Sequence, residues 1–253
     1  MAARELEFAD VSFTASGGHS ILHEVSLRVP AGQRVALLGR SGSGKTTLLR
    51  TVNALVVPTS GRVLVGGLDT TQADTIALRR SIGYVIQESG LFPHLTVAEN
   101  VRLPLQISRA AGDEARAAVE RALESVSLSV AAFGDRYPWQ LSGGQRQRAG
   151  VARALVNHPS VLLLDEPFGA LDPITRAEMQ TMLRALLQRL GTTTLLVTHD
   201  LDEALYLADR VVLLEQGRVV ADLASSEVLR SENPAMSAYV AATRPIASTG
   251  DAA

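Results

Sequence analysis

Residues 39–47, Gly-Arg-Ser-Gly-Ser-Gly-Lys-Thr-Thr, match the pattern G-x-x-x-x-G-K-[ST] of a loop that binds phosphate groups. The glycines allow a tight turn in which backbone N–H groups point inward at phosphate oxygens. Lys45 would place a positive charge near the β- and γ-phosphates of a nucleotide, and the Thr46 hydroxyl would hold Mg²⁺. The apolar run 35–38 predicts a buried strand before this loop, and residues 47–55 predict a helix after it. A chance match is the alternative, and it would lack this context.

Lys45 is the only lysine among the 24 Lys and Arg residues of the chain. The chain therefore uses arginine wherever a general positive charge is sufficient. A compact ammonium on a flexible stem is retained where a planar guanidinium would not fit, which supports the phosphate-binding interpretation. The residues expected to contact nucleotide in this loop are Gly39, Arg40, Ser41, Gly42, Ser43, Gly44, Lys45, Thr46 and Thr47.

Composition limits the class of protein. The chain has 253 residues, of which 46% are hydrophobic and 20% charged, as in a soluble globular protein. Its net charge of −2 predicts no strong attraction to nucleic acid or anionic lipid. Cysteine is absent, which excludes disulfides and thiol chemistry and suits a reducing compartment. We find neither a signal peptide nor an apolar run approaching 18 residues, so a membrane role would require a partner protein.

Hydrophobic patterns along the chain predict an α/β fold with an N-terminal antiparallel β subdomain and an inserted helical subdomain. Residues 4–29 alternate as strands around a turn at 16–19. The remaining elements are predicted as strands at 62–65, 82–86, 161–164 and 194–197, two strands within 210–221, and helices at 74–81, 96–107, 113–127, 144–157, 174–190 and 200–208. We predict one domain over 1–243, with the helical subdomain inserted at about 88–160, and a disordered tail at 244–253.

Three of the predicted apolar strands are followed by candidate phosphate-binding or catalytic residues. The run 35–38 leads into the phosphate loop, 161–164 leads into Asp165-Glu166, and 194–197 is followed by His199. Ligands of open parallel sheets bind at the carboxyl ends of the strands, so the sequence predicts one shared site. Asp165 would hold Mg²⁺ together with Thr46, and Glu166 would deprotonate an attacking water. An ordinary helix-capping acidic pair is the alternative interpretation of Asp165-Glu166.

Leu141-Ser-Gly-Gly-Gln145 lies before the helix predicted at 144–157 and forms a second candidate anion site at a helix N-terminus. One nucleotide does not need two such sites from the same chain. A dimer in which nucleotide lies between the phosphate loop of one copy and this segment of the other would use both. The alternative is a plain glycine-rich helix cap.

These motifs, in this order, resemble the nucleotide-binding subunits of ABC transporters, which are P-loop NTPases, over about residues 5–242. The match includes Gln87 as the Q-loop, the LSGGQ signature at 141–145, Gly169-Ala-Leu-Asp172 as the D-loop and His199 as the switch histidine. The resemblance implies ATP and Mg²⁺ as ligands and a head-to-tail homodimer with ATP at its interface. It implies catalytic roles for Gln87, Glu166 and His199, and places Thr46, Gln87 and Asp165 around the metal. Contacts with the partner's ATP are implied for Ser142, Gly143, Gly144, Gln145 and Asp172.

A closer resemblance, to the ATPases of osmoprotectant importers, rests on the segments 82–87, 90–94, 135–138 and 168–176. It implies energised uptake of a small quaternary amine such as glycine betaine or choline. It also implies a position on the cytoplasmic face of the membrane, with integral permease subunits and, indirectly, a substrate-binding protein as partners. A groove at 87–105 would receive a cytoplasmic helix of the permease. We expect no regulatory domains after the cassette, which larger members carry.

Other functions remain open at this point. An ATPase of a transporter for another cargo, or a soluble ABC ATPase of cluster assembly, would carry the same motifs. A binding module without catalysis is disfavoured because Glu166 and His199 are both present. The family stacks adenine on an aromatic residue, but the expected position holds Ala15, with Phe13 and His19 as alternatives. The residue that recognises the base is therefore unassigned, as are the cargo, the direction of transport and the permease.

Overall fold

The apolar runs predicted as strands form the centre of a six-stranded sheet in the computed structural model, which describes residues 2–107 and 112–244. The predicted tail at 244–253 lies outside the described residues, apart from Arg244. The strand order is β10-β9-β3-β8-β7-β6, and only β10 is antiparallel to its neighbour. The strands are β3 (Arg34–Leu38), β6 (Ile82–Val85), β7 (Val161–Asp165), β8 (Thr193–Val197), β9 (Arg210–Glu215) and β10 (Arg218–Ala224).

The two faces of this sheet enter two different cores, because successive side chains of a strand point to opposite faces. In β3, Ala36 and Leu38 pack on the side of the long helices. Val35 and Leu37 pack on the other side, against α1 (Lys45–Val52) and the N-terminal sheet. A strand that is buried on both faces has a continuous apolar sequence, which is why these strands could be predicted correctly.

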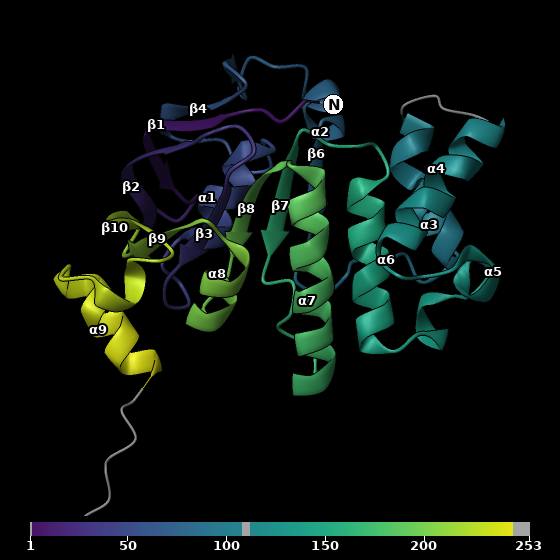
Figure 1. The fold of residues 1–253 in the computed structure, drawn as a ribbon. Coiled ribbons are helices and arrows are strands. Elements are labelled where there is room, and N and C mark those ends of the chain that lie inside the picture. Colours follow the sequence, from purple (N-terminus) through teal and green to yellow (C-terminus); the bar gives the residue numbers. More distant parts are fainter. Residues whose placement is uncertain (1, 108–111, 245–253) are drawn as a thin grey trace, which may run out of the picture.

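The N-terminal sheet is antiparallel and has the order β2-β1-β4-β5. Its strands are β1 (Leu6–Thr14), β2 (Ser20–Val29), β4 (Ser60–Val65) and β5 (Leu68–Asp69). One face of β1 is buried through Leu6, Phe8 and Val11, in agreement with the predicted alternation. Figure 1 shows this sheet beside the upper left part of the six-stranded sheet.

Helices between β6 and β7 form the right-hand part of the molecule in Figure 1. They are α3 (Val97–Ile107), α4 (Gly112–Ser125), α5 (Val130–Phe133), the 3₁₀ helix η1 (Pro138–Gln140) and α6 (Gly143–Leu155). Val101, Val119 and Leu123 are buried where α3, α4 and α6 meet. Helices α3, α4 and α6 lie where the sequence predicted them, and the status of this segment as a separate subdomain at 88–160 remains a prediction.

The remaining helices are α2 (Thr75–Arg80), α7 (Pro173–Leu190), α8 (Leu201–Leu207), the 3₁₀ helix η2 (Val228–Arg230) and α9 (Pro234–Thr243). The helix expected at 47–55 begins earlier, at Lys45, because Gly44 adopts φ 98° at its N-cap, and it ends at Val52. The sequence prediction missed α5 and α9. Within the described residues, no helix combines the length and the apolar character needed to cross a membrane.

Candidate functional site

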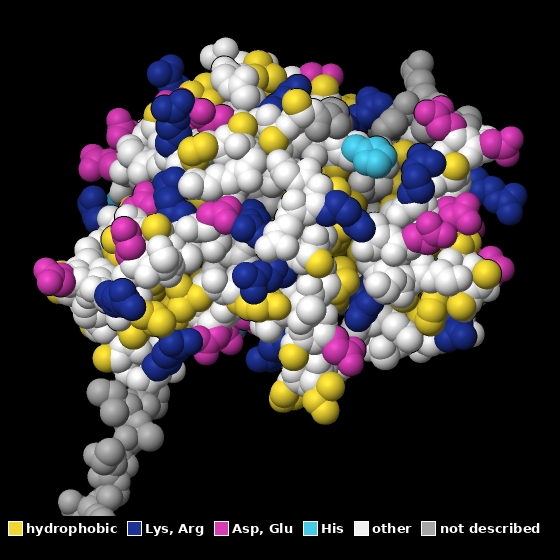
Figure 2. Space-filling model, viewed as in Figure 1, with side chains coloured by type: hydrophobic (Ala, Val, Ile, Leu, Met, Phe, Trp, Pro, Cys, Tyr) yellow, Lys and Arg dark blue, Asp and Glu magenta, His cyan; other side chains and the backbone are white. Residues whose placement is uncertain are grey.

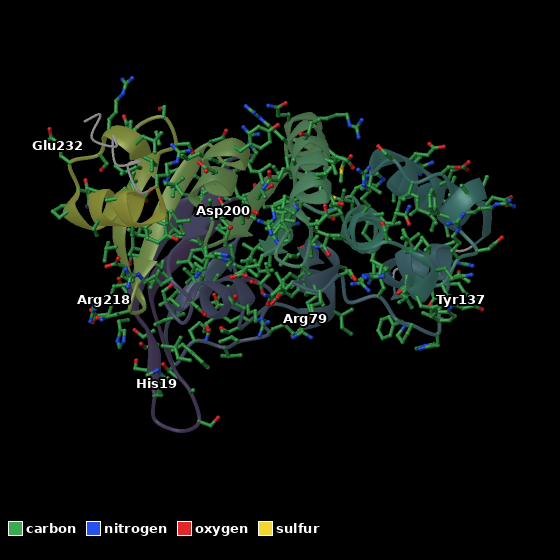
Figure 3. All side chains as sticks on the ribbon, turned by 90° about the horizontal axis from the view of Figure 1, so that it is seen from below. His19, Arg79, Tyr137, Asp200, Arg218 and Glu232 are labelled. Carbon is green, nitrogen blue, oxygen red and sulfur yellow. The ribbon has the colours of Figure 1, made fainter. Side chains whose placement is uncertain are left out.

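The three strands that lead into the candidate site residues lie next to one another, since β3 pairs with β8 and β8 pairs with β7, all in parallel. Their carboxyl ends therefore carry Gly39, His199 and the Asp165-Glu166 pair along one edge of the sheet. In Figure 1 the arrows of β7 and β8 point downward, to the side of the molecule on which α6 also begins. Figure 3 views this side and labels Asp200, the neighbour of His199, near its middle.

The phosphate loop 39–47 joins β3 to α1. Gly39 has a φ of 151°, and a Cβ atom there would lie 2.3 Å from the carbonyl oxygen of Leu214, so the loop depends on a glycine at this position. The Lys45 ammonium donates hydrogen bonds to the carbonyl oxygens of Gly39 at 2.7 Å and Arg40 at 2.8 Å. Burial lowers the pKa of Lys45, while the carboxylates of Glu166 and Asp165 act in the opposite direction.

Asp165 lies at the end of β7 with both carboxylate oxygens engaged. Oδ1 accepts a 2.7 Å hydrogen bond from the Thr46 hydroxyl, which brings together the two residues predicted to hold a metal. Oδ2 accepts a 3.1 Å hydrogen bond from the Tyr84 hydroxyl on β6 and lies 3.7 Å from the guanidinium of Arg50. The Arg50 Nε also donates to the Tyr84 hydroxyl, at 3.3 Å. Sequence analysis did not identify Tyr84 or Arg50.

Two of the predicted catalytic residues, Gln87 and His199, contact the third, Glu166. Its Oε2 accepts a 3.3 Å hydrogen bond from Gln87 Nε2 and lies 3.5 Å from Nδ1 of His199. The backbone of Glu166 has a φ of 44°, unusual for a residue with a side chain, and its N–H donates to the carbonyl of Val197 on β8. Strain of this kind often marks a functional site. The His199 side chain is 62% exposed, so it is accessible to a ligand.

Ser142 is the N-cap of α6. Its hydroxyl accepts from the N–H of Gln145, whose side chain accepts in turn from the N–H of Ser142, which forms a capping box. A Cβ atom at Gly144 would lie 2.4 Å from Cγ2 of Thr175, so a glycine is needed where α6 meets α7. Gly143 is half-buried and Ser142 is exposed. Within residues 2–107 and 112–244, no hydrogen bond joins this segment to the phosphate loop.

Asp172 caps the N-terminus of α7 and accepts hydrogen bonds from the N–H groups of Ile174 and Thr175. The side chain of Thr175, followed by the N–H groups of Thr175 and Ile174, lowers the pKa of Asp172. Ile174 follows two residues later with 75% of its surface exposed. Figure 2 shows hydrophobic side chains gathered at this lower end of α7, where they face solvent.

The residues considered for base recognition lie in the β1–β2 hairpin, Phe13 within β1 and Ala15 and His19 in the turn. The backbone N–H of Ala15 donates to the carbonyl of His19 across the turn. His19 is exposed at the tip of the hairpin (Figure 3), whereas Phe13 packs partly against the buried cluster below the N-terminal sheet. None of the three is held against the phosphate loop by a hydrogen bond, and the base-recognising residue remains unassigned.

A phosphate loop between β3 and α1, with two carboxylates at the end of β7, the parallel strand on the far side of β8, defines a P-loop nucleotide-binding domain. The family model of ABC transporters matches residues 22–169. A solved structure of the dimeric ATP-binding cassette MJ0796 bound to ADP and Pi superposes with a TM-score of 0.78 at 36% identity, covering 87% of this chain and 98% of that chain. The cassette cbiO1 from Clostridium perfringens gives a TM-score of 0.81 at 30% identity, with 95% of both chains covered.

Curated relatives extend the comparison. The carnitine transport ATP-binding protein OpuCA of Listeria monocytogenes is 43% identical over 92% of this chain and 58% of its own length. The osmoprotectant import ATP-binding protein OsmV of Salmonella typhimurium is 47% identical over 81% of this chain and 54% of its own length. The sulfate/thiosulfate import ATP-binding protein CysA of Caulobacter vibrioides is 47% identical over 80% and 60%. The chain thus spans less than two thirds of the length of these relatives.

The chain belongs to the ABC transporter family and has the fold of its ATP-binding cassette. The predicted fold class is confirmed, and so is the resemblance to the ATPases of osmoprotectant importers. The phosphate loop, the Asp165-Glu166 pair and His199 could be predicted because each follows a strand with an unambiguous apolar pattern. Tyr84 and Arg50 were not predicted, because the segment 82–87 was used only for the resemblance and gave Tyr84 no role of its own.

Proposed function

We propose that this chain binds and hydrolyses ATP as the motor subunit of an ABC importer. The observation that carries the proposal is the convergence of Gln87 and His199 on one carboxylate oxygen of Glu166, next to the Thr46–Asp165 pair. In this site Glu166 accepts the proton of the attacking water, and Gln87 and His199 orient Glu166. Lys45 and the backbone N–H groups of residues 39–47 hold the phosphates. The Ser43 hydroxyl, buried without a hydrogen-bond partner, fits a phosphate oxygen as its acceptor.

The residues around Asp165 fit a magnesium ion. Thr46, Asp165 and Gln87 offer hydroxyl, carboxylate and amide oxygens, which are the ligand types that Mg²⁺ prefers. When bound, the ion neutralises charge on the phosphate oxygens. Thr46 and Asp165 would hold it, since their oxygen atoms already lie 2.7 Å apart, and Gln87 would supply an amide oxygen.

We further propose a homodimer with ATP at its interface. The Ser142 segment and the phosphate loop lie toward the same side of the molecule (Figure 1). Among the described residues they share no hydrogen bond, as expected if the two segments of one copy contribute to two different nucleotide sites of the dimer. Ser142, Gly143, Gly144 and Gln145 of one copy then face the ATP held by the partner. The exposed Ile174, two residues after Asp172, supplies an apolar contact with the partner. The related bacterial ABC transporter cassette MJ0796 has been solved as a dimer, which supports this arrangement.

An apolar groove of about 630 Å³ is proposed as the binding site of the permease. It lies between α2, α3 and α6 and includes Phe92, which is 48% exposed. Its lining extends beyond the expected segment 87–105 to Ile76, Arg79, Arg80, Arg153, Ala154 and Asn157. We propose that a helix of an integral membrane subunit occupies this groove, which places the chain at the cytoplasmic face of the membrane.

The proposed cargo is a quaternary amine such as glycine betaine, carnitine or choline, delivered to the permease by a substrate-binding protein. Relatives named for carnitine, choline and osmoprotectant transport support this class. Relatives named for sulfate and thiosulfate import show similar identity, so transport of another cargo is the second candidate.

Uptake measurements test the proposal. Cells that lack the gene are complemented with the wild-type chain or with Phe92→Arg, and uptake of labelled glycine betaine, carnitine, choline and sulfate is measured under osmotic stress. Trp139→Arg is the matched control, because Trp139 is a similarly exposed aromatic outside the groove. We expect loss of amine uptake in the deletion strain and in Phe92→Arg only. Loss of sulfate uptake alone would reassign the cargo, and unchanged uptake of all four solutes would contradict an importer of this class.

A further inference from the structure

One side chain of helix α9, that of Tyr239, contacts the segment that carries His199. Asn233 caps α9 by accepting from the N–H of Met236, and its amide donates to the carbonyl of Val220 on β10. The buried face of α9 consists of Met236 and Tyr239, one turn apart. Tyr239 is 7% exposed and packs in the same core as α7 and α8. Figure 1 shows α9 beside α8 on the side of the molecule where the strands end.

The Tyr239 hydroxyl donates a 2.7 Å hydrogen bond to the backbone carbonyl of His199. Burial raises the pKa of Tyr239, and so does the nearby Asp200, so the hydroxyl stays protonated and can donate at neutral pH. Arg40 and the backbone of Gly39 act in the opposite direction.

Hydrogen bonds also hold the two neighbours of His199 along the chain. Thr198 donates a 2.7 Å hydrogen bond to the buried Glu203, and the N–H of Asp200 donates back to the Thr198 hydroxyl. Arg244, at the end of α9, forms an ion pair with Asp202 of α8. Hydrogen bonds thus fix Thr198 and Asp200, the neighbours of His199, and Tyr239 holds the carbonyl of His199 itself. The backbone held in this way sets the direction of the His199 side chain.

We propose that Tyr239 is a positioning residue for the switch histidine. By holding the His199 carbonyl, it keeps Nδ1 of His199 directed at Glu166, 3.5 Å away, and it thereby couples α9 to the proposed general base. Tyr239 acts through His199 and does not touch the reacting atoms. The inference rests on the proposed ATPase function.

The test compares Tyr239→Phe with Tyr206→Phe in the purified chain. Tyr239→Phe keeps the buried ring and removes the donor. Tyr206 lies on α8 with its ring 4.4 Å from the Arg184 guanidinium, so its variant loses the same hydroxyl from a neighbouring helix. The rate of ATP hydrolysis, the KM for ATP, the affinity for a fluorescent ATP analogue and the melting temperature are measured for both variants and wild type.

We expect Tyr239→Phe to lower kcat about three- to tenfold, the effect of losing one well-placed hydrogen bond, with KM, affinity and melting temperature close to wild type. Tyr206→Phe should leave all four quantities unchanged. An unchanged kcat in Tyr239→Phe overturns the inference. A fall in kcat accompanied by equal losses of affinity and melting temperature also overturns it, because it indicates a purely structural role. If the wild-type chain does not hydrolyse ATP, the proposed function itself fails, which distinguishes the two failures.

Discussion

The Tyr84 hydroxyl donates a 3.1 Å hydrogen bond to Oδ2 of Asp165, the oxygen opposite the one that accepts from Thr46. This bond links β6, which leads into Gln87, to the proposed metal ligand on β7. Burial raises the pKa of Tyr84, so the phenol remains a donor at neutral pH. Tyr84 and Arg50 thereby fix the orientation of a carboxylate whose other oxygen faces the proposed magnesium site.

Replacement of Tyr84 by Phe should weaken the response of the protein to Mg²⁺. Partners that orient a metal ligand typically contribute 10- to 100-fold to metal affinity, and we expect the Mg²⁺ concentration for half-maximal ATP hydrolysis to rise about tenfold. Nucleotide affinity measured in EDTA should not change, since the phosphate loop is intact. Tyr137→Phe is the control, because Tyr137 stacks on Trp139 beside the Ser142 segment and does not touch Asp165. An unchanged Mg²⁺ dependence in Tyr84→Phe would refute this role.

The fold of the core could be predicted because its strands are buried on both faces and read as continuous apolar runs. The site could be predicted as far as each motif directly follows such a strand, as Asp165 and Glu166 do. Tyr84 could not be predicted, because its hydroxyl meets a carboxylate 81 positions away along the chain, and local patterns do not specify how neighbouring strands align.

Helix α9 was missed for a different physical reason. It buries only Met236 and Tyr239, so its sequence lacks the long apolar stripe by which amphipathic helices are identified. The contact between Tyr239 and His199 depends on how α9 packs on β10 and α8, and no single segment of sequence encodes that packing. The start of α1 was misplaced by two residues because the left-handed Gly44, which forms its N-cap, was assigned to the loop alone.

Base selectivity gives a second prediction. Our sequence prediction aligns Ala15 with the aromatic residue on which the family stacks adenine, and on this alignment ATP and GTP should bind with similar affinity. Stacking of a base on an aromatic side chain contributes about 1–3 kcal/mol, and Ala15→Tyr should therefore tighten ATP binding at least about fivefold. Ala15→Leu is the control that adds apolar area without a ring. Equilibrium binding of fluorescent nucleotides provides the measurement.

An unaltered affinity in Ala15→Tyr, combined with weaker binding in Phe13→Leu, would move base recognition to Phe13. The leucine variant is preferred to alanine because Phe13 packs partly against the core cluster that contains Leu22. A large cavity there would destabilise the fold and lower affinity without any change in stacking. The melting temperature of Phe13→Leu separates these two effects.

The third prediction concerns Glu166 and the proposed dimer. Glu166→Gln keeps the shape of the side chain and its contacts with Gln87 and His199 but cannot accept a proton from water. Loss of a general base typically lowers the rate 10²–10⁴-fold, so ATP hydrolysis should fall by about this factor while ATP binding persists. Glu120→Gln, an identical change at an exposed position of α4, should hydrolyse ATP at the wild-type rate.

Blocked hydrolysis should also trap the dimer. If each ATP is held by Lys45 of one copy and Ser142 of the other, Glu166→Gln should elute as a dimer on sizing chromatography with ATP and as a monomer with ADP. Adding Ser142→Arg should restore the monomer, because Ser142 is exposed at the start of α6 and a guanidinium there would occupy the place of the partner's phosphate. Hydrolysis by Glu166→Gln above about a third of the wild-type rate would mean that another residue is the base. A monomer at saturating ATP would show that the two halves of the site do not meet in the isolated subunit.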